Sequence, residues 1–215
     1  KKRLEDSIKE KEVLIQEIHH RVKNNLQIVS SLLNLEKNSI SDEKMKSILM
    51  DCQYRIKTIS VVHDKLLNPG NLGVVDCRQY LKELISEMKA ANINHPNDLN
   101  FSLNIYPFKL NVDTAIPLGL LINEIFTNIM KYGGNKNGIT EACIEIIKEE
   151  PDRFLMNIGD NGPGYADEVF NQEEGNVGVT LIRALAGQLG GVIKKINFEE
   201  KPGTHYQFVF ELPPA

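Results

Sequence analysis

Two adjacent histidines, His19 and His20, stand in a predicted helical segment, residues 17–27, that has the sequence EIHHRVKNNLQ. A neutral imidazole can attack phosphorus through one ring nitrogen while a hydrogen bond to the other nitrogen fixes its tautomer. At about 100° per residue, His19 lies roughly 55° from the centre of the apolar stripe of the helix, whereas His20 lies roughly 155° away and faces outward. Because partners can reach an outward-facing imidazole, we predict that His20 is the nucleophile and that His19 is a packing residue at the edge of the stripe.

A second polar set lies on the predicted helix that ends at Tyr132. Glu124, Asn128 and Lys131 are spaced i, i+4 and i+7, so they share one helix face. An amide oxygen suits a hard cation such as Mg²⁺, an ammonium group meets phosphate charge, and a carboxylate can orient or activate a nucleophile. A solvated helix face can have the same pattern. The set therefore indicates a magnesium–triphosphate site only if other nucleotide-binding features accompany it.

A glycine-containing turn, residues 159–164 with the sequence GDNGPG, follows a predicted strand. Asp160, at the end of that strand, can accept a hydrogen bond from an amino group of a ligand. Gly162 and Gly164 allow the backbone to approach the ligand closely because they carry no Cβ atom. The same residues also make an ordinary loop sequence, so the turn alone is only a candidate binding site.

Two further segments are candidates for nucleotide contacts. Gly175 and Gly178 lie in a turn at the start of a predicted helix, where backbone N–H groups can bind phosphate. Thr204 follows Gly203 at the start of the last predicted strand, where its hydroxyl group can reach a purine. Each signal is weak alone. Their order along the chain, after the histidine helix and the Glu124 helix, makes the combination a strong indication of ATP-dependent phosphoryl transfer.

The histidines lie in a region, residues 1–68, that contains neither proline nor glycine. Its apolar residues recur at spacings of three, four and seven, as in amphipathic helices, and a polar stretch near residues 38–41 predicts a turn between two helices. The stripe of the first helix consists of Leu4, Ile8, Ile15, Ile18, Val22, Leu26, Val29 and Leu33. Because one hairpin cannot cover its own stripes, we expect it to pair with a second copy into a four-helix bundle.

Residues 69–75 are predicted to be a linker because Pro69 and Gly70 interrupt the helical pattern. Beyond it, helical and strand patterns are mixed, and Asp76 and Asp113 are the predicted N-caps of the first two helices. The expected helices span residues 76–91, 113–132 and 178–189, and the expected strands span residues 101–106, 140–148, 153–159, 192–198 and 206–212. This order predicts an α/β sandwich with helices on one face of a mixed sheet.

The composition is that of an ordinary globular protein of 215 residues, with 41% hydrophobic residues and a net charge of −4. The negative charge argues against a nucleic-acid-binding surface, which needs clustered positive charge. No apolar run approaches the roughly 20 residues needed to cross a bilayer.

The three cysteines, Cys52, Cys77 and Cys143, are far apart without metal-site spacing. They are expected to be reduced, inert thiols. The chain begins in a helical pattern, so we expect a cytoplasmic fragment of a longer protein.

Together these segments resemble bacterial two-component sensor histidine kinases over nearly the whole chain. Residues 17–27 are similar to the phosphoacceptor segment of the second dimerisation and histidine-phosphotransfer subfamily, and residues 62–67 resemble the end of its second helix. The later segments resemble the N, G1, G2 and G3 boxes of the ATP-binding fold shared with gyrase, Hsp90 and MutL. The resemblance implies a helical hairpin over residues 1–68, then an α/β sandwich ATP-binding domain of this GHKL (Bergerat) type over residues 76–215.

The resemblance also implies roles for single residues. Asn128 is expected to ligate Mg²⁺, and Glu124 occupies the position of the catalytic carboxylate. Asp160 is expected to bind the adenine amino group, and Thr204 to support adenine recognition. By the same resemblance, Gly162, Gly164 and Gly178 are expected to shape the nucleotide pocket. Lys131 and Gly175, which were identified from their spacing and position, complete the predicted ATP-binding residues.

Two departures from related patterns are informative. Lys131 ends the N box, and the chain contains no tryptophan, which places it outside the sister subfamily that is named for its His, Trp and Glu residues. Many histidine kinases have an acidic residue directly after the phosphoacceptor, whereas this chain has Arg21. The base that activates His20 therefore stays open between Glu124 and Glu17, with Glu124 favoured.

The resulting hypothesis is autophosphorylation of His20 from Mg-ATP and transfer of the phosphoryl group to an aspartate of a response regulator. Two alternatives are a non-catalytic dimeric phosphotransfer or scaffold protein with a degenerate nucleotide site, and a serine kinase of the anti-sigma type. We expect a homodimer through residues 1–68. We expect no nucleic-acid partner and no membrane contact in this part of the protein.

Overall fold

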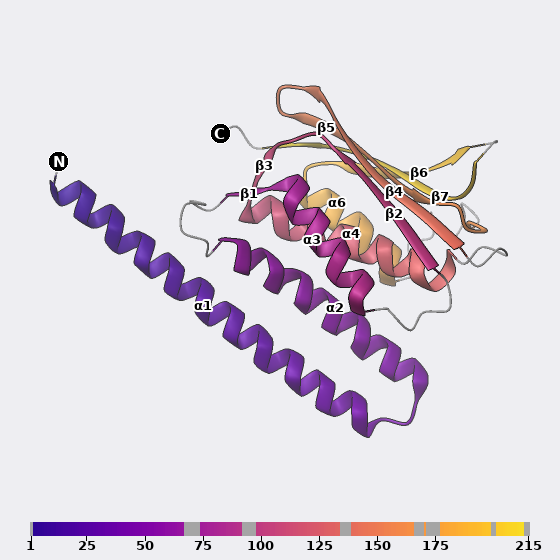
Figure 1. The fold of residues 1–215 in the computed structure, drawn as a ribbon, viewed down its shortest axis with the longest axis horizontal. Helices are drawn as coiled ribbons and strands as arrows, with labels where there is room; N and C mark the ends of the chain where they lie inside the picture. The colour runs from indigo at the N-terminus through magenta and orange to yellow at the C-terminus, as the bar shows by residue number, and fades with distance from the viewer. Residues whose placement is uncertain are drawn as a thin grey trace. The chain divides into compact units, whose positions relative to one another are not determined.

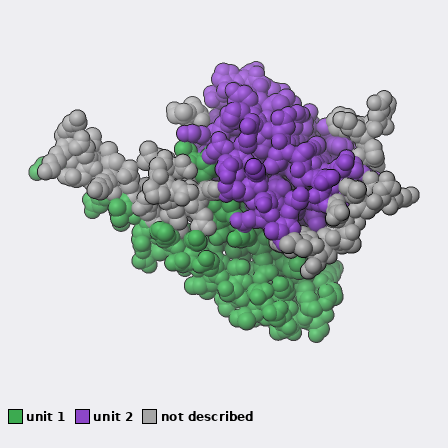
Figure 2. All heavy atoms as spheres, in the orientation of Figure 1, with its two compact units in different colours: residues 1–75 green, residues 76–215 purple. Residues whose placement is uncertain are grey.

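The computed structural model describes residues 2–66, 74–91, 98–133, 139–165, 170, 177–198 and 201–212. The predicted site residue Gly175 lies outside these ranges, and the side chain of His19, which was predicted to be a packing residue, is also outside the described part of the structure. The chain divides into two compact units, Lys1–Val75 and Asp76–Ala215, which Figure 2 shows in different colours.

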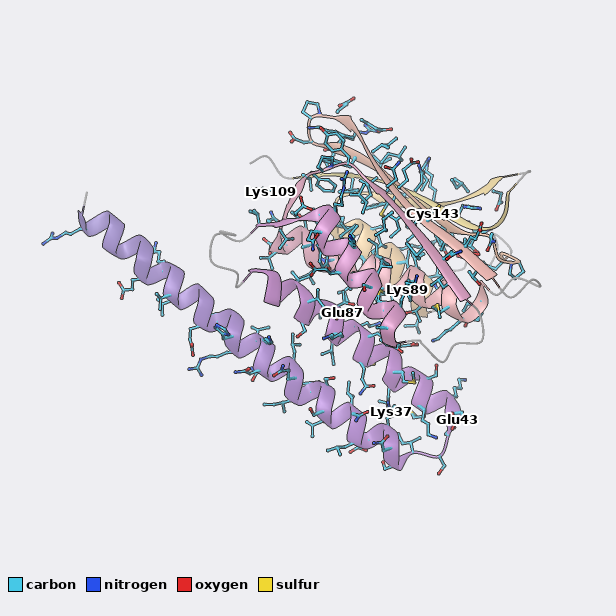
Figure 3. All side chains as sticks on the ribbon, viewed as in Figure 1. Lys37, Glu43, Glu87, Lys89, Lys109 and Cys143 are labelled. Atoms are coloured by element: carbon cyan, nitrogen blue, oxygen red, sulfur yellow. The ribbon has the colours of Figure 1, made fainter. Side chains whose placement is uncertain are left out.

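The first unit is a hairpin of two helices, α1 (Lys2–Ser39) and α2 (Glu43–Leu66) (Figure 1). Residues 40–42 form the connection, close to the predicted turn. Asp42 caps α2, because its Oδ1 atom accepts hydrogen bonds from the backbone N–H groups of Lys44 at 2.8 Å and Met45 at 3.1 Å. Lys37 in the last turn of α1 and Glu43 in the first turn of α2 (Figure 3) have the signs that complement the helix dipoles.

The apolar surface of α1 is broader than the single predicted stripe. Val22, Leu26 and Leu33 are half-buried, as expected for residues that face α2. Ile18 and Val29, which were predicted in the same stripe, are 59% and 44% exposed. Further exposed apolar side chains on α1 are Val13, Leu14, Ile28, Leu32 and Leu35. In the described part of the hairpin, these apolar side chains of α1 are thus not covered by α2.

The second unit contains a five-stranded sheet with the order β2-β4-β5-β7-β6. β2 is parallel to β4, whereas the other neighbouring strands are antiparallel. The strands are β2 (Asp98–Ile105), β4 (Ile139–Glu150), β5 (Arg153–Asp160), β7 (Lys201–Glu211) and β6 (Val192–Phe198). A separate two-stranded sheet pairs β1 (Val74–Asp76) with β3 (Lys109–Asn111).

Within the described residues, three helices cover one face of the large sheet (Figure 1): α3 (Cys77–Ala91), α4 (Val112–Tyr132) and α6 (Val177–Gln188). Side chains alternate along each strand between this face and the open one. On β4, Ile144 and Ile146 are buried, whereas Cys143 between Ala142 and Ile144 is exposed (Figure 3). This arrangement confirms the predicted α/β sandwich with helices on one face of a mixed sheet.

The core lies between the helices and the inner face of the sheet. α4 is its central helix, since Leu118, Leu121, Ile122 and Ile125 are completely inaccessible to solvent. Aromatic side chains close the core beside it; for example, the rings of Phe154 and Phe210 stack with centroids 5.6 Å apart. The helix that carries Glu124 and Asn128 is therefore held by the most deeply buried part of the unit.

One detail of the second unit differs from the prediction. The N-cap of α4 is Asn111 and not Asp113, because Asn111 has an extended backbone and its side chain accepts a 2.9 Å hydrogen bond from the backbone N–H of Thr114. β1 begins at Val74, inside the predicted linker. The predicted cap of α3 agrees with the structure, since Oδ1 of Asp76 accepts a 2.8 Å hydrogen bond from the backbone N–H of Gln79.

In the described part of the chain, no helix combines the length and the apolar character that crossing a membrane requires.

Candidate functional site

The polar residues of α4 differ in their exposure. Glu124 is 5% exposed and buried, Asn128 is half-buried, and Lys131 is exposed. The side-chain amide of Asn123 donates a 3.4 Å hydrogen bond to Oε1 of Glu124. The three predicted residues thus run from the buried part of the helix towards its exposed C-terminal end.

Asp160 is the last residue of β5, where it pairs with Ala142 of β4. Its carboxylate accepts a 2.7 Å hydrogen bond from the backbone N–H of Gly162 and a further one from the backbone N–H of Thr204. The residue is only 5% exposed. Two predicted segments that are far apart in the sequence, the turn after β5 and the start of β7, therefore meet at one carboxylate.

Burial is the main influence on the ionisation of Asp160. It raises the pKa of this carboxyl above its usual value, because the charged form loses hydration. The two backbone N–H donors act in the opposite direction, as does the nearby imidazole of His205. A buried carboxylate with a raised pKa and fixed donors on one side is typical of ligand-binding sites.

Glycines surround Asp160 because there is no room for side chains. A Cβ atom on Gly203 would lie 1.7 Å from the backbone oxygen of Asp160, and the φ of Gly203 is +119°. A Cβ atom on Gly162 would lie 2.7 Å from Oδ1 of Asp160 and 2.7 Å from Cα of Gly133. Gly164 has a φ of +68°, and its Cβ atom would lie 2.8 Å from the backbone oxygen of Gly203. These close approaches give a physical reason for Gly162 and Gly164 in the predicted motif.

The end of α4 is tied to the same region. The Thr140 hydroxyl group on β4 donates a 3.1 Å hydrogen bond to the backbone oxygen of Gly133. Asn161 accepts a 2.8 Å hydrogen bond on its Oδ1 atom from the backbone N–H of Glu141 and donates its own N–H to the Glu141 oxygen at 3.0 Å. The turn after β5 and the C-terminus of α4 are thus fixed through β4.

These segments enclose a cavity of about 520 Å³, which is within the usual range for small-molecule sites. Five predicted site residues line it: Asn128, Lys131, Asp160, Gly164 and Thr204. The other described lining residues are Ile125, Ile129, Tyr132, Gly133, Pro163, Tyr165, Val179 and Tyr206. Glu124, Gly162 and Gly178 are not among the described residues that line the cavity, although Gly178 is next to Val179 and Gly162 holds Asp160.

Two tyrosines of this cavity were missed by the sequence analysis. The hydroxyl groups of Tyr165 and Tyr206 form a hydrogen bond, although the two residues are 41 positions apart in the sequence. Tyr206 is 1% exposed, and burial raises the pKa of its phenol. The sequence contained one signal that could have identified them: Tyr165 directly follows Gly164, and Tyr206 lies two residues after Thr204. The cavity therefore has polar groups on one wall and apolar residues of α4 on another.

His20 lies on α1 of the first unit and is exposed. Next to it, a nitrogen of Arg21 lies 2.7 Å from Oε1 of Glu17, one helical turn earlier, and both side chains are well exposed. Such exposed pairs contribute about 0–1 kcal/mol to stability. The ion pair nevertheless matters for the choice of the base, because it involves Glu17, one of the two carboxylates predicted as candidates to activate His20.

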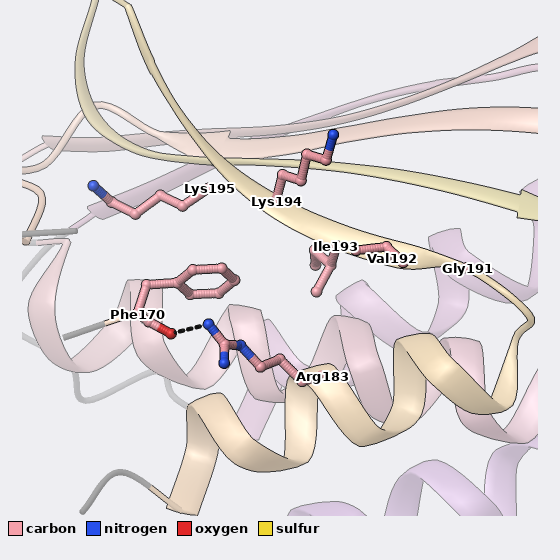
Figure 4. A pocket seen from close by; sticks show the side chains of 7 residues that line it. All are labelled: Phe170, Arg183, Gly191, Val192, Ile193, Lys194 and Lys195. Atoms are coloured by element: carbon pink, nitrogen blue, oxygen red, sulfur yellow. Dashed lines mark hydrogen bonds between the residues drawn. The ribbon is translucent and has the colours of Figure 1, made fainter. Parts of the chain in front are cut away.

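A second cavity, of about 500 Å³, lies between α6 and the edge strand β6 (Figure 4). Arg183 lies over the ring of Phe170 at 4.7 Å and donates a hydrogen bond to its backbone oxygen. Lys194 and Lys195 of β6 also line this cavity. None of the predicted site residues within the described ranges lines this second cavity.

A dedicated metal site is not present in the described part of the chain, because no three His, Cys, Asp or Glu side chains gather there. Mg²⁺ in nucleotide sites usually has one or two protein ligands, with phosphate oxygens and water completing the shell. Asn128, on the wall of the larger cavity, offers one such ligand.

Comparisons with known proteins agree with this geometry. Residues 17–92 match the family described as histidine kinase, and residues 113–215 match the histidine kinase-, DNA gyrase B- and HSP90-like ATPase family. The sensor histidine kinase PdtaS of Mycolicibacterium smegmatis is 29% identical over 218 residues, which cover 99% of this chain and 42% of that protein. The blue-light-activated histidine kinase 2 of Erythrobacter litoralis is 22% identical over 179 residues, which cover 81% of this chain and 50% of that protein.

Solved structures have the same fold. The Erythrobacter litoralis EL346 blue-light activated histidine kinase matches with a TM-score of 0.68 at 19% identity, covering 93% of this chain and 59% of that one. Its histidine kinase domain matches with a TM-score of 0.64 at 15% identity, covering 86% and 95%. The chain spans half or less of the length of the two curated relatives. On these matches and the site geometry, the chain belongs to the bacterial sensor histidine kinases and contains an ATPase domain of the type found in gyrase and Hsp90.

Proposed function

We propose that this chain transfers the γ-phosphoryl group of Mg-ATP to its own His20 and then to an aspartate of a response regulator. The observation that carries the proposal is the cavity in which Asn128, Lys131, Asp160 and Thr204 converge. A kinase needs such a site together with an accessible acceptor, and His20 is exposed on α1. In this proposal, residues 1–68 form the dimerisation and phosphotransfer domain, residues 69–75 the linker, and residues 76–215 the catalytic domain.

The residues of the cavity fit ATP in their chemistry. A buried carboxylate with fixed donors on one side can accept a hydrogen bond from the adenine amino group, the role proposed for Asp160. The Thr204 hydroxyl would assist base recognition, and the apolar residues of α4, such as Ile125 and Ile129, would contact the base. Lys131 would meet phosphate charge, and the amide of Asn128 would ligate Mg²⁺. Gly178, at the start of α6, would leave backbone N–H groups available for phosphate.

Phosphoryl transfer depends mainly on positioning and on neutralising charge. Bound Mg²⁺ would neutralise part of the negative charge on the phosphate oxygens. The contribution of the protein would be to hold the nucleobase at Asp160, to orient the phosphates with Asn128 and Lys131, and to present one ring nitrogen of His20. Exclusion of bulk water by the apolar wall of the cavity would favour transfer to His20 over hydrolysis.

We propose Glu124 as the carboxylate that orients the His20 imidazole and accepts its proton. Glu17 is the less suitable candidate because Arg21 already engages it. Glu124 is buried and hydrogen-bonded to Asn123, which would restrict its orientation. A fixed carboxylate serves better for this purpose, because the tautomer of the attacking imidazole depends on a hydrogen bond to its other nitrogen.

The proposed partners follow from the first unit and from the family. The exposed apolar residues of α1, including Leu14, Ile18 and Leu32, support a homodimer in which two hairpins form a four-helix bundle. A response regulator would then receive the phosphoryl group from His20. We also propose that this part of the protein works in the cytoplasm, where ATP and such regulators are found.

Equilibrium binding of a fluorescent ATP analogue with Mg²⁺ tests the nucleotide site. The native chain should bind it, and Asn128→Ala should weaken binding by about tenfold or more, which is the usual effect of losing a metal ligand or its support. Circular dichroism would verify that the variant is folded. A chain that does not bind the analogue would instead be the non-catalytic phosphotransfer protein. Acid-stable labelling of a serine in a partner would point to the serine kinase.

A further inference from the structure

The side chain of Asn123 is a polar group in the most apolar part of α4. Asn123 is only 1% exposed, and its neighbours Leu121, Ile122 and Ile125 on the same helix are completely inaccessible to solvent. Within the described part of the chain, its Oδ1 atom is buried without a hydrogen-bond partner. Its amide nitrogen donates a 3.4 Å hydrogen bond to Oε1 of Glu124. An apolar side chain would therefore suit the packing at this position better than an amide does.

This amide is unfavourable for folding. A buried acceptor that has lost its water and gained no donor costs free energy. The bond to Glu124 compensates little of that cost, because its length of 3.4 Å exceeds the usual value of about 3 Å. Residues that break a packing rule without a gain in stability are expected where function requires them. The asparagine therefore calls for an explanation that lies outside the stability of the core.

Glu124 determines which end of the Asn123 amide faces it. A carboxylate only accepts hydrogen bonds, whereas an amide has a donating NH₂ end and an accepting oxygen end. The NH₂ end is thus attracted to Oε1 of Glu124, and the opposite orientation would place two acceptors against each other. The amide consequently holds one oxygen of the carboxylate from the adjacent position on the helix.

We infer that Asn123 is a positioning residue for phosphoryl transfer: its amide holds the Glu124 carboxylate in the orientation in which it accepts the proton of the His20 imidazole. The inference rests on the proposed role of Glu124 and extends it to the residue that orients it. Asn123 is not among the described residues that line the nucleotide cavity. Its effect should therefore be on the rate of transfer and not on the affinity for the nucleotide.

The step that Asn123 would assist is the attack of His20 on ATP. One ring nitrogen of the imidazole forms a bond to the γ-phosphorus, and the bond from this phosphorus to the oxygen that bridges it to the β-phosphate breaks, so that ADP leaves. The proton on the other ring nitrogen passes to Glu124. A carboxylate that rotates away from this nitrogen cannot take up the proton as the new bond forms.

The test measures three properties of each variant: the rate of labelling from γ-radioactive ATP at saturating Mg-ATP, the affinity for the fluorescent ATP analogue, and the midpoint of urea unfolding. Asn123→Leu replaces the amide by an apolar side chain of similar size, and Asn123→Ala removes it without filling the space. Ile122→Val is the matched control, because it shortens a fully buried neighbour and leaves the amide in place. Glu124→Gln removes the proposed proton acceptor.

Both Asn123 variants should be labelled about tenfold to a hundredfold more slowly than the native chain, which is part of the factor of about 10²–10⁴ that a positioned general base contributes. Both should bind the analogue with native affinity. Asn123→Leu should unfold at a urea concentration at least as high as the native chain, because the leucine removes the unpaired buried oxygen. Ile122→Val should be less stable than the native chain but labelled at the native rate.

The double variant shows whether the amide acts through the carboxylate. Glu124→Gln should slow labelling, and adding Asn123→Leu to it should have no further effect. Asn123 variants that are labelled at the native rate would overturn the inference. A slowing by Asn123→Leu that persists in full in the Glu124→Gln background would also overturn it, and so would a lower urea midpoint for Asn123→Leu, which would assign the amide to packing.

Failure of the proposed function gives a different result. A native chain that takes up no label would refute the proposed function itself. If Glu124→Gln is labelled like the native chain, the proposed role of Glu124 is wrong and the inference falls with it. If Glu124→Gln slows labelling and the Asn123 variants do not, the inference alone is wrong.

Discussion

The backbone N–H of Gly162 donates a 2.7 Å hydrogen bond to Oδ1 of Asp160, and a Cβ atom on Gly162 would lie 2.7 Å from that same oxygen. The glycine is therefore both the donor that holds the carboxylate and the residue that makes room for it. Any larger residue at position 162 has to move Asp160 or break this hydrogen bond. The turn after β5 is thus built around one side chain, and its glycines can be tested individually.

Gly162→Ala should destabilise the second unit by about 1–3 kcal/mol, the usual effect of overpacking a close contact. The added methyl group would also meet the backbone of Gly133. Denaturant unfolding measures the loss. Gly187→Ala is the matched control, because a Cβ atom on Gly187 meets nothing within 4 Å on α6. There the alanine should stabilise the helix by up to about 1 kcal/mol. Equal effects at the two sites would contradict the described packing of the turn.

Asp160→Asn should weaken binding of the ATP analogue by about tenfold to a hundredfold, because a hydrogen bond to a charged group is lost. An amide has one acceptor oxygen, whereas Gly162, Thr204 and the nucleobase would all donate to this position.

The native carboxyl has a pKa raised by burial. The protonated Asp160 carboxyl therefore stabilises the folded chain at pH values below the pKa that this group has in the unfolded chain. This stabilisation is lost as the pH rises through the pKa that the group has in the folded chain.

The melting temperature of Asp160→Asn should consequently increase relative to that of the native chain as the pH rises. Differential scanning calorimetry of both proteins at several pH values upward from about 4, near the ordinary aspartate value, measures the difference. A gain that is constant with pH would show that the carboxyl ionises in the folded chain as it does in the unfolded one.

Asn111→Ala should cost about 1 kcal/mol of unfolding free energy, because it removes the N-cap of α4. Asp113→Ala should have a smaller effect, since Asp113 is exposed in the first turn and interacts mainly with the helix dipole. The pair is compared by urea unfolding. The reverse order of effects would restore the prediction, made from the sequence, that Asp113 is the cap.

The thiols should differ in reactivity. Cys143 is exposed on β4 and should react at once with an aromatic disulfide reagent. Cys77 is buried, and burial followed by the charge of Asp76 raises the pKa of its thiol, so it should react only when the second unit unfolds. Absorbance of the released thiolate gives the rates, with Cys143→Ser as the control that removes the fast phase. A fast phase that persists in this variant would mean that another cysteine is accessible.

Much of this architecture could be predicted from the sequence, because long elements have strong periodicity. The hairpin and the five long strands follow from spacings of three and four or from alternation over several residues. Short elements have no such signal: β1 and β3 have three residues each. The cap of α4 was misplaced because Asn111 and Asp113 are both good capping residues, and periodicity does not distinguish positions two residues apart.

The site was predictable where a motif is continuous in the sequence. Asp160, Gly162 and Gly164 belong to one turn, and Asn128 and Lys131 to one helix. Tyr165 and Tyr206 could not be paired in advance, because their contact depends on the neighbouring positions of β5 and β7. Exposure of Ile18 and Val29 depends on which side of α1 faces α2, which periodicity alone leaves open.

The central claim is that His20 accepts the phosphoryl group, and labelling with ATP that is radioactive in its γ-phosphate tests it most directly. The chain should incorporate label that is lost in acid and retained in base, as expected for a phosphorus–nitrogen bond. His19→Gln should be labelled like the native chain, and His20→Gln should not be labelled although it binds the ATP analogue normally. Labelling that persists in His20→Gln, or that is lost only in His19→Gln, would contradict the account.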